Sequence, residues 1–294
     1  MFYCELCPRK CHVPRGETGK GFCGMGEKPV IARAALHFDE EPCISGSRGS
    51  GAVFFSGCTL GCVYCQNWEI SHDHFGSPVG EGGLRAVFDR LIEQEAHNIN
   101  LVTGTPFTHA IIDAIEEKPM PVPVVWNSSG YERLETLKML RGKVQVYLPD
   151  LKYMDVPGGR DYSLAADYAE VAQKALREMA RQVGEPLFDE EDVMVRGMLV
   201  RHLILPGRVK QSIRVLDWIH DNLPRGTYVS LMAQYLPCGK AKTMPPLDRR
   251  ITEKEYDQVV DHLFKLGMEN GFTQELSSAD EVFIPPFDLT GVNE

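Results

Sequence analysis

The sequence lacks an apolar run near the roughly 18 residues that a membrane-spanning helix requires. Its first residues, MFYCELCPRKC, contain no apolar h-region, so no secretory signal is expected there. Basic residues are outnumbered, because 31 Lys and Arg stand against 41 Asp and Glu and give a formal net charge of −10. A chain this acidic is not expected to bind nucleic acid nonspecifically. We therefore predict a cytoplasmic protein that acts on neither membranes nor nucleic acids.

Cysteine, by contrast, is abundant and unevenly placed. The chain has nine cysteines, and eight of them lie within its first 65 residues. The odd count, the close spacing and the lack of a signal argue against a disulfide framework. In a reducing compartment, clustered thiols favour a metal or an iron–sulfur site. The composition therefore predicts metal chemistry near the N-terminus.

The hydrophobic pattern divides the chain near residue 50. Residues 1–50 are rich in Cys, Gly, Pro and charge, with one short apolar run, PVIARAAL, and such a segment needs a metal to order it. From residue 51 to 294, apolar runs alternate with helical periodicity. Strands are expected at 51–57, 98–104, 121–127, 144–152, 194–207 and 227–236, with a last extended stretch at 272–287. Helices are expected at 84–97, 108–117, 131–140, 164–183, 213–222 and 253–271.

These β–α units predict an α/β fold with a parallel sheet covered by helices, because their strands are dense in Val, Ile and Leu. About six units of this size favour a partial (β/α)6 TIM-like barrel over a dinucleotide-binding sheet. The barrel would occupy residues 51–294 and carry a Cys-rich metal-binding extension over residues 1–50. Ligands of parallel α/β folds bind at the carboxyl ends of strands, so the residues after each strand are the candidates.

The loop SGCTLGCVYCQNWEIS follows the first predicted strand and holds three cysteines with C-x3-C-x2-C spacing: Cys58, Cys62 and Cys65. Gly57 and Gly61 favour a loop that wraps a cluster, since glycine permits a positive φ. A cubane cluster normally takes four Cys ligands, so three leave one iron with an open position. An open position is what a catalytic metal requires. The alternative is a structural zinc site with Cys43 or Cys238 as the fourth ligand.

This loop resembles the signature of radical S-adenosylmethionine (radical SAM) enzymes, C-x3-C-x-aromatic-C, with Tyr64 as the aromatic residue. The resemblance implies that the three cysteines hold a [4Fe–4S] cluster, and that SAM chelates the fourth iron through its amino and carboxylate groups. It further implies reductive cleavage of SAM to a 5′-deoxyadenosyl radical, which abstracts hydrogen from a substrate. The full or partial (β/α) barrel of that family agrees with the strand pattern above.

The segments CVYCQNWEIS, VTGTP, WNSSGY, PDLKYMD and VRHLILPG occur in the order seen in activating enzymes of the pyruvate formate-lyase type. With its Cys-rich N-terminus, the chain resembles the uncharacterised activating-enzyme-like group labelled PflX. The resemblance implies a set of SAM-binding residues at the strand ends: Tyr64, Thr103, Gly104, Thr105, Asn127, Ser128, Asp150, Lys152, Arg201 and His202. The family has a Gly-Gly-Glu turn where this chain has Thr103–Thr105, so backbone carbonyls and hydroxyls would replace the missing carboxylate. An ordinary βα turn is the alternative there.

Side chains along an extended segment point alternately to its two sides, which predicts the relative orientation of two pairs of residues in this set. Asp150 and Lys152 should face the same side and act together, with a surface ion pair as the alternative. Arg201 and His202 are neighbours and should face opposite sides, and the sequence leaves open which one points inward. An arginine inside the barrel would need an anionic partner such as the SAM carboxylate. The alternative for His202 is a hydrogen-bonded core residue.

Cys238, in the segment QYLPCGK, stands near the point where the activating enzymes place a histidine close to SAM. We predict that it lies near the barrel mouth as a catalytic hydrogen-atom or thiyl partner, or as a cluster ligand. Thiols suit these roles because they are soft ligands and are easily oxidised. A buried structural cysteine is the alternative.

A second set of four cysteines precedes the loop, with C-x2-C-x3-C-x11-C spacing: Cys4, Cys7, Cys11 and Cys23. Four thiolates predict a closed site, either zinc or an auxiliary [4Fe–4S] cluster. This segment is also basic within an acidic chain, through Arg9, Lys10, Arg15 and Lys20. It is a candidate docking face for an electron donor such as flavodoxin or ferredoxin, with a solvated charged face as the alternative. For Cys43 we expect a structural role.

We therefore predict a radical SAM oxidoreductase that abstracts hydrogen from a protein or peptide substrate, in one version installing a glycyl radical. The first alternative is the same chemistry on a small molecule. The second is a non-catalytic iron–sulfur or zinc protein for electron transfer or metal handling. The non-catalytic alternative is disfavoured by Asp150, Lys152 and the TGTP turn, because an electron carrier does not require SAM-binding residues.

Overall fold

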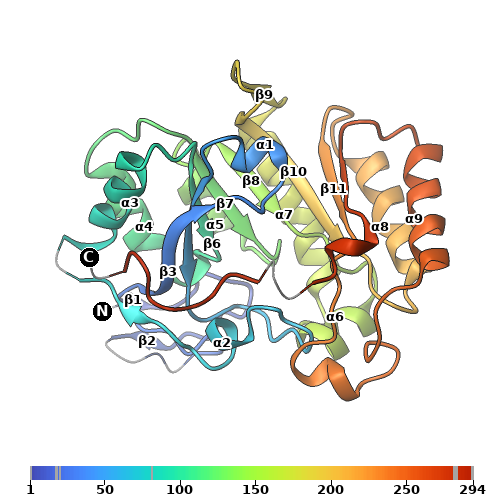
Figure 1. The fold of residues 1–294 in the computed structure, drawn as a ribbon. Helices are drawn as coiled ribbons and strands as arrows, with labels where there is room; N and C mark the ends of the chain where they lie inside the picture. Colours follow the sequence, from blue (N-terminus) through green and yellow to red (C-terminus); the bar gives the residue numbers. More distant parts are fainter. Residues whose placement is uncertain (1, 17–18, 20, 81, 281–283, 293–294) are drawn as a thin grey trace.

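The structure is a computed structural model that describes residues 2–16, 19, 21–80, 82–280 and 284–292. A ten-stranded sheet lies at its centre, in the order β12-β11-β10-β8-β7-β6-β4-β3-β5, with β9 paired to β10. Adjacent strands from β4 through β12 along this order are parallel, whereas β3 pairs antiparallel with β4 and β5. Figure 1 shows the sheet in the middle of the molecule, with helices on its flanks.

The elements follow the expected alternation of strand and helix. The parallel strands are β4 (Ser50–Phe55), β6 (Ile99–Val102), β7 (Val124–Ser128), β8 (Val146–Pro149), β10 (Met194–Leu203), β11 (Tyr228–Met232) and β12 (Gly271–Thr273). The antiparallel strands of the sheet are β3 (Val30–His37), β5 (Ser77–Pro78) and β9 (Leu187–Phe188). The helices are α1 (Pro42–Ser45), α2 (Trp68–Ser71), α3 (Gly83–Glu93), α4 (Thr108–Glu116), α5 (Leu134–Leu140), α6 (Val156–Ser163), α7 (Tyr168–Val183), α8 (Val209–Asn222) and α9 (Glu253–Lys265). The predicted α/β fold with a parallel central sheet is confirmed, while its closure into a partial barrel stays a prediction.

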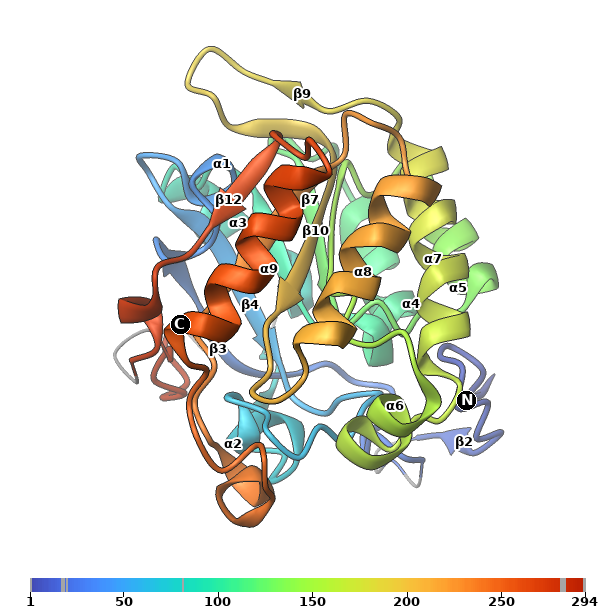
Figure 2. The ribbon, with the colours of Figure 1, turned by 90° about the vertical axis from the view of Figure 1, so that its right-hand side faces the viewer.

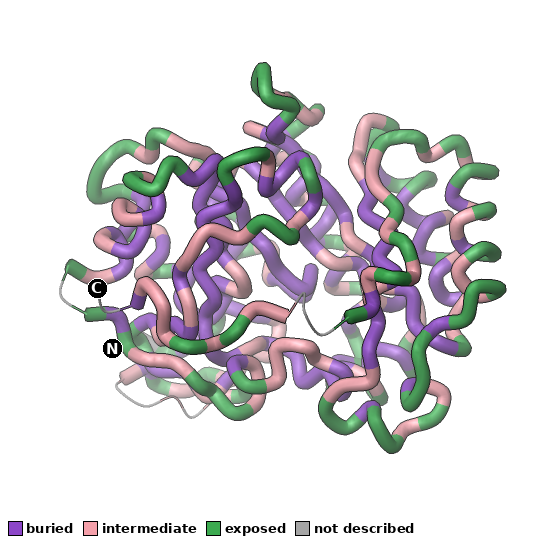
Figure 3. Tube along the Cα trace, in the orientation of Figure 1, coloured by how far each residue is buried: buried purple, intermediate pink, exposed green. Residues whose placement is uncertain are grey.

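Side chains of the parallel strands alternate between two apolar environments. On one face, Leu101 and Trp126 join the large cluster that also contains the buried apolar residues of helices such as α3 and α7. On the other face, Val125 and Leu148 pack against Ile44 of the short helix α1. Strands buried on both faces have nearly continuous apolar sequences, which is why the expected strands could be recognised. Figure 3 shows these strands buried, while the outer turns of the helices are exposed.

Helix α7 illustrates how the helices cover the sheet. Its buried residues recur every three or four positions and form one stripe: Tyr168, Ala172, Ala175, Leu176, Met179, Ala180 and Val183. Through this stripe α7 packs against β8 and β10, and Figure 2 shows α7, α8 and α9 on the same side of the molecule. None of the helices in the described residues combines the length and the apolar character that a bilayer crossing requires.

The predicted division at residue 50 falls between two strands of one sheet. The run PVIARAAL forms most of β3, which pairs with β4 from Ile31 opposite Phe55 to His37 opposite Ser50. The C-terminal segment returns to the same strand, where the Ala34 amide donates to the carbonyl of Thr290 at 2.8 Å. The sheet therefore begins before residue 50, and the first 29 residues are the part that precedes it.

The N-terminal residues lie at the carboxyl ends of the parallel strands. There, β1 (Phe2–Tyr3) and β2 (Pro14–Arg15) form a separate antiparallel pair. Figures 1 and 2 show β2, α2 and α6 at the same end of the molecule. The Thr136 hydroxyl of α5 donates to the carbonyl of Leu6 at 2.7 Å, which ties this segment to the helical layer. The fold therefore brings both cysteine-containing segments to the edge where ligands of such sheets bind.

Candidate active site

The loop that leaves β4 at its carboxyl end carries the three predicted cluster ligands Cys58, Cys62 and Cys65. Its path is fixed by α6, because the Gly61 amide donates to the carbonyl of Ser163 at 3.2 Å. Gly57 has a φ of 78°, as the prediction of a wrapping loop requires. Gly61 does not have a positive φ, so that part of the prediction is wrong. A Cβ at this position would lie 2.8 Å from Cδ1 of Leu164, so glycine serves close packing there.

The three thiols share one electrostatic environment. Burial raises the pKa of each thiol, to about 11 for Cys65. Neighbouring thiolates raise the pKa of Cys58 and Cys65 further, while the ammonium group of Lys152 lowers all three. Soft thiol ligands beside a cation suit an anionic iron–sulfur cluster. No group of three or more Cys, His, Asp or Glu side chains among the described residues is arranged to hold a metal ion, so the fit rests on this donor set.

Asp150 and Lys152 form a buried ion pair beyond the end of β8. The Lys152 Nζ lies 2.6 Å from Asp150 Oδ2, so the two side chains face the same side, as predicted. Burial opposes the ionisation of Asp150, but the positive charges of Lys152 and Arg201 outweigh it and lower the pKa of Asp150. Burial likewise opposes the charge of Lys152, and the Asp150 carboxylate reverses that effect and raises its pKa. The pair is charged and about 15% exposed, so it is not a surface ion pair.

Arg201 joins this pair from β10. Its Nε donates to Asp150 Oδ1 at 3.1 Å, its Nη1 to Glu40 Oε2 at 3.0 Å and its Nη2 to Asn127 Oδ1 at 2.6 Å. The anionic partners of this guanidinium are therefore two carboxylates of the chain itself. The expected anionic partner of a buried Arg201 is therefore present, and a contact with the SAM carboxylate stays a prediction.

Glu40 is the central site residue that the sequence analysis missed. It lies between β3 and α1, and its Oε1 accepts from Asn100 at 3.2 Å and from Asn127 at 3.0 Å. We call the resulting set the strand-end network: Glu40, Asn100, Asn127, Asp150, Lys152 and Arg201. In the sequence, FDEEP looks like a solvated acidic run. Only the packing of α1 against one face of the sheet brings Glu40, the first glutamate of this run, to the strand ends.

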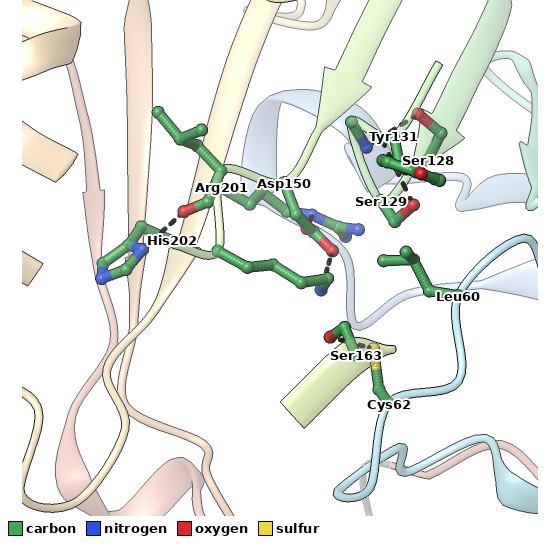
Figure 4. A network of polar contacts seen from close by, with 12 residues as sticks. Leu60, Cys62, Ser128, Ser129, Tyr131, Asp150, Ser163, Arg201 and His202 are labelled. Carbon is green, nitrogen blue, oxygen red and sulfur yellow. Dashed lines mark hydrogen bonds and ion pairs between the residues drawn. The ribbon is translucent and has the colours of Figure 1, made fainter. Parts of the chain in front are cut away.

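His202 lies on the opposite face of β10 and outside this network. Its Nδ1 lies 2.7 Å from the carbonyl oxygen of Leu151, and its Nε2 lies 2.9 Å from the Ser212 hydroxyl of α8. Burial lowers its pKa to about 4, which keeps the ring neutral at pH 7. Figure 4 shows Arg201 beside Asp150 and His202 turned away from them. The cofactor-binding role expected of His202 does not fit this placement, whereas the hydrogen-bonded core alternative does.

The TGTP turn is anchored by a second carboxylate that the sequence did not reveal. Thr103 and Gly104 lead from β6 into a 3-10 helix at Thr105–Phe107. The Thr105 hydroxyl donates to Glu132 Oε1 at 2.6 Å, and burial raises the pKa of Glu132 to about 7. The Ser128 hydroxyl accepts from the Gly130 amide at 3.3 Å and makes no hydrogen bond to a member of the strand-end network among the described residues. Of the predicted pair after β7, Asn127 alone belongs to that network.

Tyr64, the aromatic residue of the cysteine loop, is buried against other tyrosines. Its hydroxyl lies 2.5 Å from the hydroxyl of Tyr153, which follows Lys152 in the chain. Its ring also packs edge-on to Tyr235, with centroids 5.8 Å apart. The loop therefore contacts the segments after both β8 and β11.

Cys238 lies close to the cysteine loop, in the segment after β11. The Ala241 amide donates to the carbonyl of Val63 at 3.0 Å, and Gln66 Nε2 donates to the carbonyl of Gln234 at 3.1 Å. Two contacts thus hold the segment around Cys238 against the cysteine loop. Its chemical role stays a prediction.

The four N-terminal cysteines line one cavity: Cys4, Cys7, Cys11 and Cys23. Among the described residues their side chains are not arranged as a metal-binding group, so a common metal site stays a prediction. Burial raises the pKa of Cys7 to about 12. Arg15 reaches into the same cavity and is 1% exposed, with its Nη1 3.4 Å from Cys23 Sγ and its Nη2 donating to the carbonyl of Pro106. One cationic side chain therefore connects the cysteine set with the TGTP turn.

The basic docking face expected around these cysteines is not assembled as predicted. Arg15 is buried, and Arg9 folds inward, where its Nε donates to the carbonyl of Thr59 at 3.0 Å. Its guanidinium also stacks on the Phe22 ring, 3.8 Å from the centroid. Lys10 is exposed, and Lys20 lies outside the described residues. Arg9 thus joins the N-terminal segment to the cysteine loop, and Arg15 joins it to the TGTP turn. Cys43 is buried in the cluster around α1, in line with the structural role expected of it.

Comparisons with known proteins found a family model, a curated relative and solved structures that are similar to this chain. Residues 45–156 match the family described as a 4Fe-4S single cluster domain. The uncharacterised protein MJ0674 of Methanocaldococcus jannaschii is 30% identical over 275 residues, covering 90% of this chain and 75% of that protein. SuiB of Streptococcus suis, bound to its precursor peptide SuiA, matches with a TM-score of 0.50 and 12% identity over 76% of this chain and 48% of SuiB. SuiB bound to S-adenosylmethionine matches with a TM-score of 0.49 and 12% identity, covering 76% of this chain and 49% of SuiB. This chain spans about half of SuiB, and the likeness is one of fold alone.

Proposed function

We propose that this chain, which belongs to the same family as MJ0674, is a radical SAM enzyme whose cluster is held by Cys58, Cys62 and Cys65. One observation carries the proposal: the three-cysteine loop, inside the segment that matches a 4Fe-4S domain, lies close enough to the Asp150–Lys152 pair for the Lys152 ammonium group to lower the pKa of all three thiols. Three thiolates leave one iron of a cubane open. That position is where SAM would bind, as it is bound by the radical SAM enzymes that the loop resembles.

The strand-end network is the surface that we assign to SAM. When bound, SAM and the cluster would supply a 5′-deoxyadenosyl radical, and the chain would bind, orient and shield them. The Lys152 ammonium group pairs with Asp150 and lowers the pKa of the Cys62 thiol, so it is suited to an anionic cluster or a carboxylate. Arg201 already binds two carboxylates, so we assign it the task of fixing Asp150 and Asn127. We also assign SAM contacts to Tyr64 and the Thr103–Thr105 turn, as the resemblance to radical SAM enzymes implies.

The second cysteine set supports a further centre, which we propose to be zinc or an auxiliary [4Fe–4S] cluster. Four soft ligands around one cavity suit either choice. Arg15 among these thiols would offset part of their negative charge. A resident metal would also help to hold the described N-terminal residues 2–16 and 21–29, which are rich in polar residues and glycine, in place.

For the substrate we propose a protein or peptide, as the resemblance to activating enzymes implies, with glycyl-radical installation as its most specific version. Electrons would come from a donor such as flavodoxin or ferredoxin. Cys238 beside the cysteine loop would act in hydrogen transfer. The competing hypotheses are a small-molecule substrate and a non-catalytic electron carrier.

The experiment is anaerobic reconstitution followed by incubation with dithionite and SAM. We expect 5′-deoxyadenosine from the wild-type chain and none from Cys62→Ala, which removes one ligand of the open cluster. A fully loaded cluster that cleaves no SAM would leave the electron-carrier hypothesis standing. A radical EPR doublet on an added partner protein would select the activating-enzyme version over the small-molecule one.

A further inference from the structure

A line of buried hydroxyl groups reaches one of the three cysteine sulfurs. The Tyr64 and Tyr153 hydroxyl oxygens are 2.5 Å apart, and the Tyr153 oxygen lies 2.9 Å from Ser163 Oγ. Ser163 Oγ in turn lies 3.0 Å from Cys62 Sγ. Figure 4 shows Ser163, at the end of α6, joined to Cys62 of the loop. Three hydroxyl groups thus form a line that ends at a single thiol.

Counting hydrogens fixes the direction of this line when Cys62 is a thiolate. Each hydroxyl has one hydrogen to donate, and a thiolate has none. Ser163 must then donate to Cys62, which leaves its oxygen to accept from Tyr153. Tyr153 donates its only hydroxyl hydrogen to Ser163, so its oxygen accepts from the Tyr64 hydroxyl. Every group in the line is satisfied in one arrangement, and that arrangement directs a hydrogen bond at the sulfur.

A shorter line of the same kind reaches Cys65. Ser71, the last residue of α2, donates to Cys65 Sγ at 3.2 Å and lies 2.8 Å from His72 Nδ1. Because the Ser71 hydrogen is used on the sulfur, His72 must donate from Nδ1. The His72 ring is held by stacking on Trp68, with centroids 3.7 Å apart. Cys58, in contrast, receives a backbone amide, that of Leu60, at 3.4 Å.

We propose that Ser163 and Ser71 are positioning residues that set the reduction potential of the cluster held by the three cysteines. This inference rests on the proposed function, because it requires the cluster at Cys58, Cys62 and Cys65. Reduction adds one electron from a low-potential one-electron donor and breaks no bond in the protein. The added charge is partly carried by the sulfurs, where a hydrogen bond stabilises it. Each serine therefore makes the cluster easier to reduce than it would be with unbonded sulfurs.

The test is an EPR-monitored redox titration of the reconstituted full chain, followed on the signal that Cys62→Ala lacks. Ser163→Ala should shift the midpoint to a more negative potential. We expect the reduced-to-oxidised ratio at a fixed potential to fall about tenfold, which is about 59 mV for one electron. Ser163→Thr keeps the hydroxyl and should restore the wild-type midpoint. Ser212→Ala removes a buried hydroxyl that bonds to His202, and should leave the midpoint unchanged.

A loaded Ser163→Ala protein with the wild-type midpoint overturns the proposal. If that variant does not load its cluster, Tyr153→Phe decides, because it keeps Ser163 and removes the group that orients it. A loaded Tyr153→Phe protein should be shifted in the same direction by a smaller amount, and an unshifted one contradicts the directed line. Failure of the proposed function looks different, since it appears in the wild-type chain as a missing cluster or as a loaded cluster that cleaves no SAM.

Discussion

The Arg201 guanidinium of β10 lies 3.0 Å from the Glu40 carboxylate, which precedes it by 161 residues. This contact joins the segment between β3 and α1 to strand β10, and both side chains are largely buried. Removing one partner of such a pair leaves an uncompensated charge away from water. The Glu40–Arg201 contact should therefore hold the site together and also contribute to the stability of the sheet.

Glu40→Ala is expected to lower the free energy of unfolding by about 3–5 kcal/mol, because Arg201 and two asparagines lose their acceptor. Glu40→Gln keeps one acceptor oxygen and should cost less. Urea denaturation of the purified chain gives both values. The control is Asp39→Ala, an exposed acidic neighbour, which should change stability by no more than about 0.5 kcal/mol. Equal effects of the variants at positions 39 and 40 would contradict the role of the network.

Lys152→Met should weaken SAM binding without emptying the cluster site. The ammonium group is lost from beside Asp150 and the thiols, and we expect at least a tenfold loss of affinity, about 1.4 kcal/mol. SAM binding to the reconstituted protein and its iron content are measured together. Lys174→Met, which breaks an exposed ion pair with Glu170, serves as the control. Unchanged SAM affinity in Lys152→Met at full iron content would remove Lys152 from the site.

Glu132 should give the folded chain a pH-dependent stability of definite sign. Burial raises its pKa from 4.5 to about 7, so between these values the folded state keeps a proton that the unfolded state has released. This contribution to stability is present below pH 4.5 and is lost as the pH rises towards 7, by roughly 3 kcal/mol in all. Glu132→Gln removes the dependence, so its stability relative to wild type should increase from pH 4.5 to 7. The exposed Glu117→Gln variant should show no such trend, and a flat difference for Glu132→Gln would refute the assignment.

The N-terminal cysteines should hold a metal separate from the loop cluster. Cys7→Ala, at a buried position in the four-cysteine cavity, is expected to remove one zinc ion or one cubane per chain and leave the loop cluster in place. Elemental analysis for zinc, iron and sulfide distinguishes the two metals. Cys43→Ala is the matched control, since this cysteine is buried in the cluster around α1. The same metal content in Cys7→Ala as in wild type would mean that the cavity is not a metal site.

Much of the architecture could be predicted from local sequence signals. Strands such as Val124–Ser128 are buried on both faces, so their sequences form apolar runs that can be recognised. The residues that follow each run can then be identified as candidate site residues. The same property hid the orientation of Arg201 and His202. Their strand neighbours are apolar on both sides, so no alternation marks the inner face. The pairing of Asp150 with Lys152 was predictable because it depends only on the geometry of one extended segment.

Contacts between distant segments could not be predicted in this way. Glu40 reaches the site through the placement of α1. Glu132 follows β7 and contacts Thr105, which follows the neighbouring strand β6. Ser163 approaches Cys62 from the end of α6, and the sequence of this helix contains no motif that predicts a contact with the cysteine loop. Arg9 and Arg15 looked like a basic surface because a sequence does not show which charges will be desolvated. These residues owe their roles to tertiary packing.

The central claim is that the three-cysteine loop leaves one iron open for SAM. The most direct measurement is the EPR spectrum of the reduced, reconstituted chain before and after SAM is added. Binding to an iron should change the spectrum in the wild-type chain and in Cys7→Ala, while Cys62→Ala should show no such response. A spectrum that stays the same at saturating SAM, with the loop cluster fully loaded, would contradict the account.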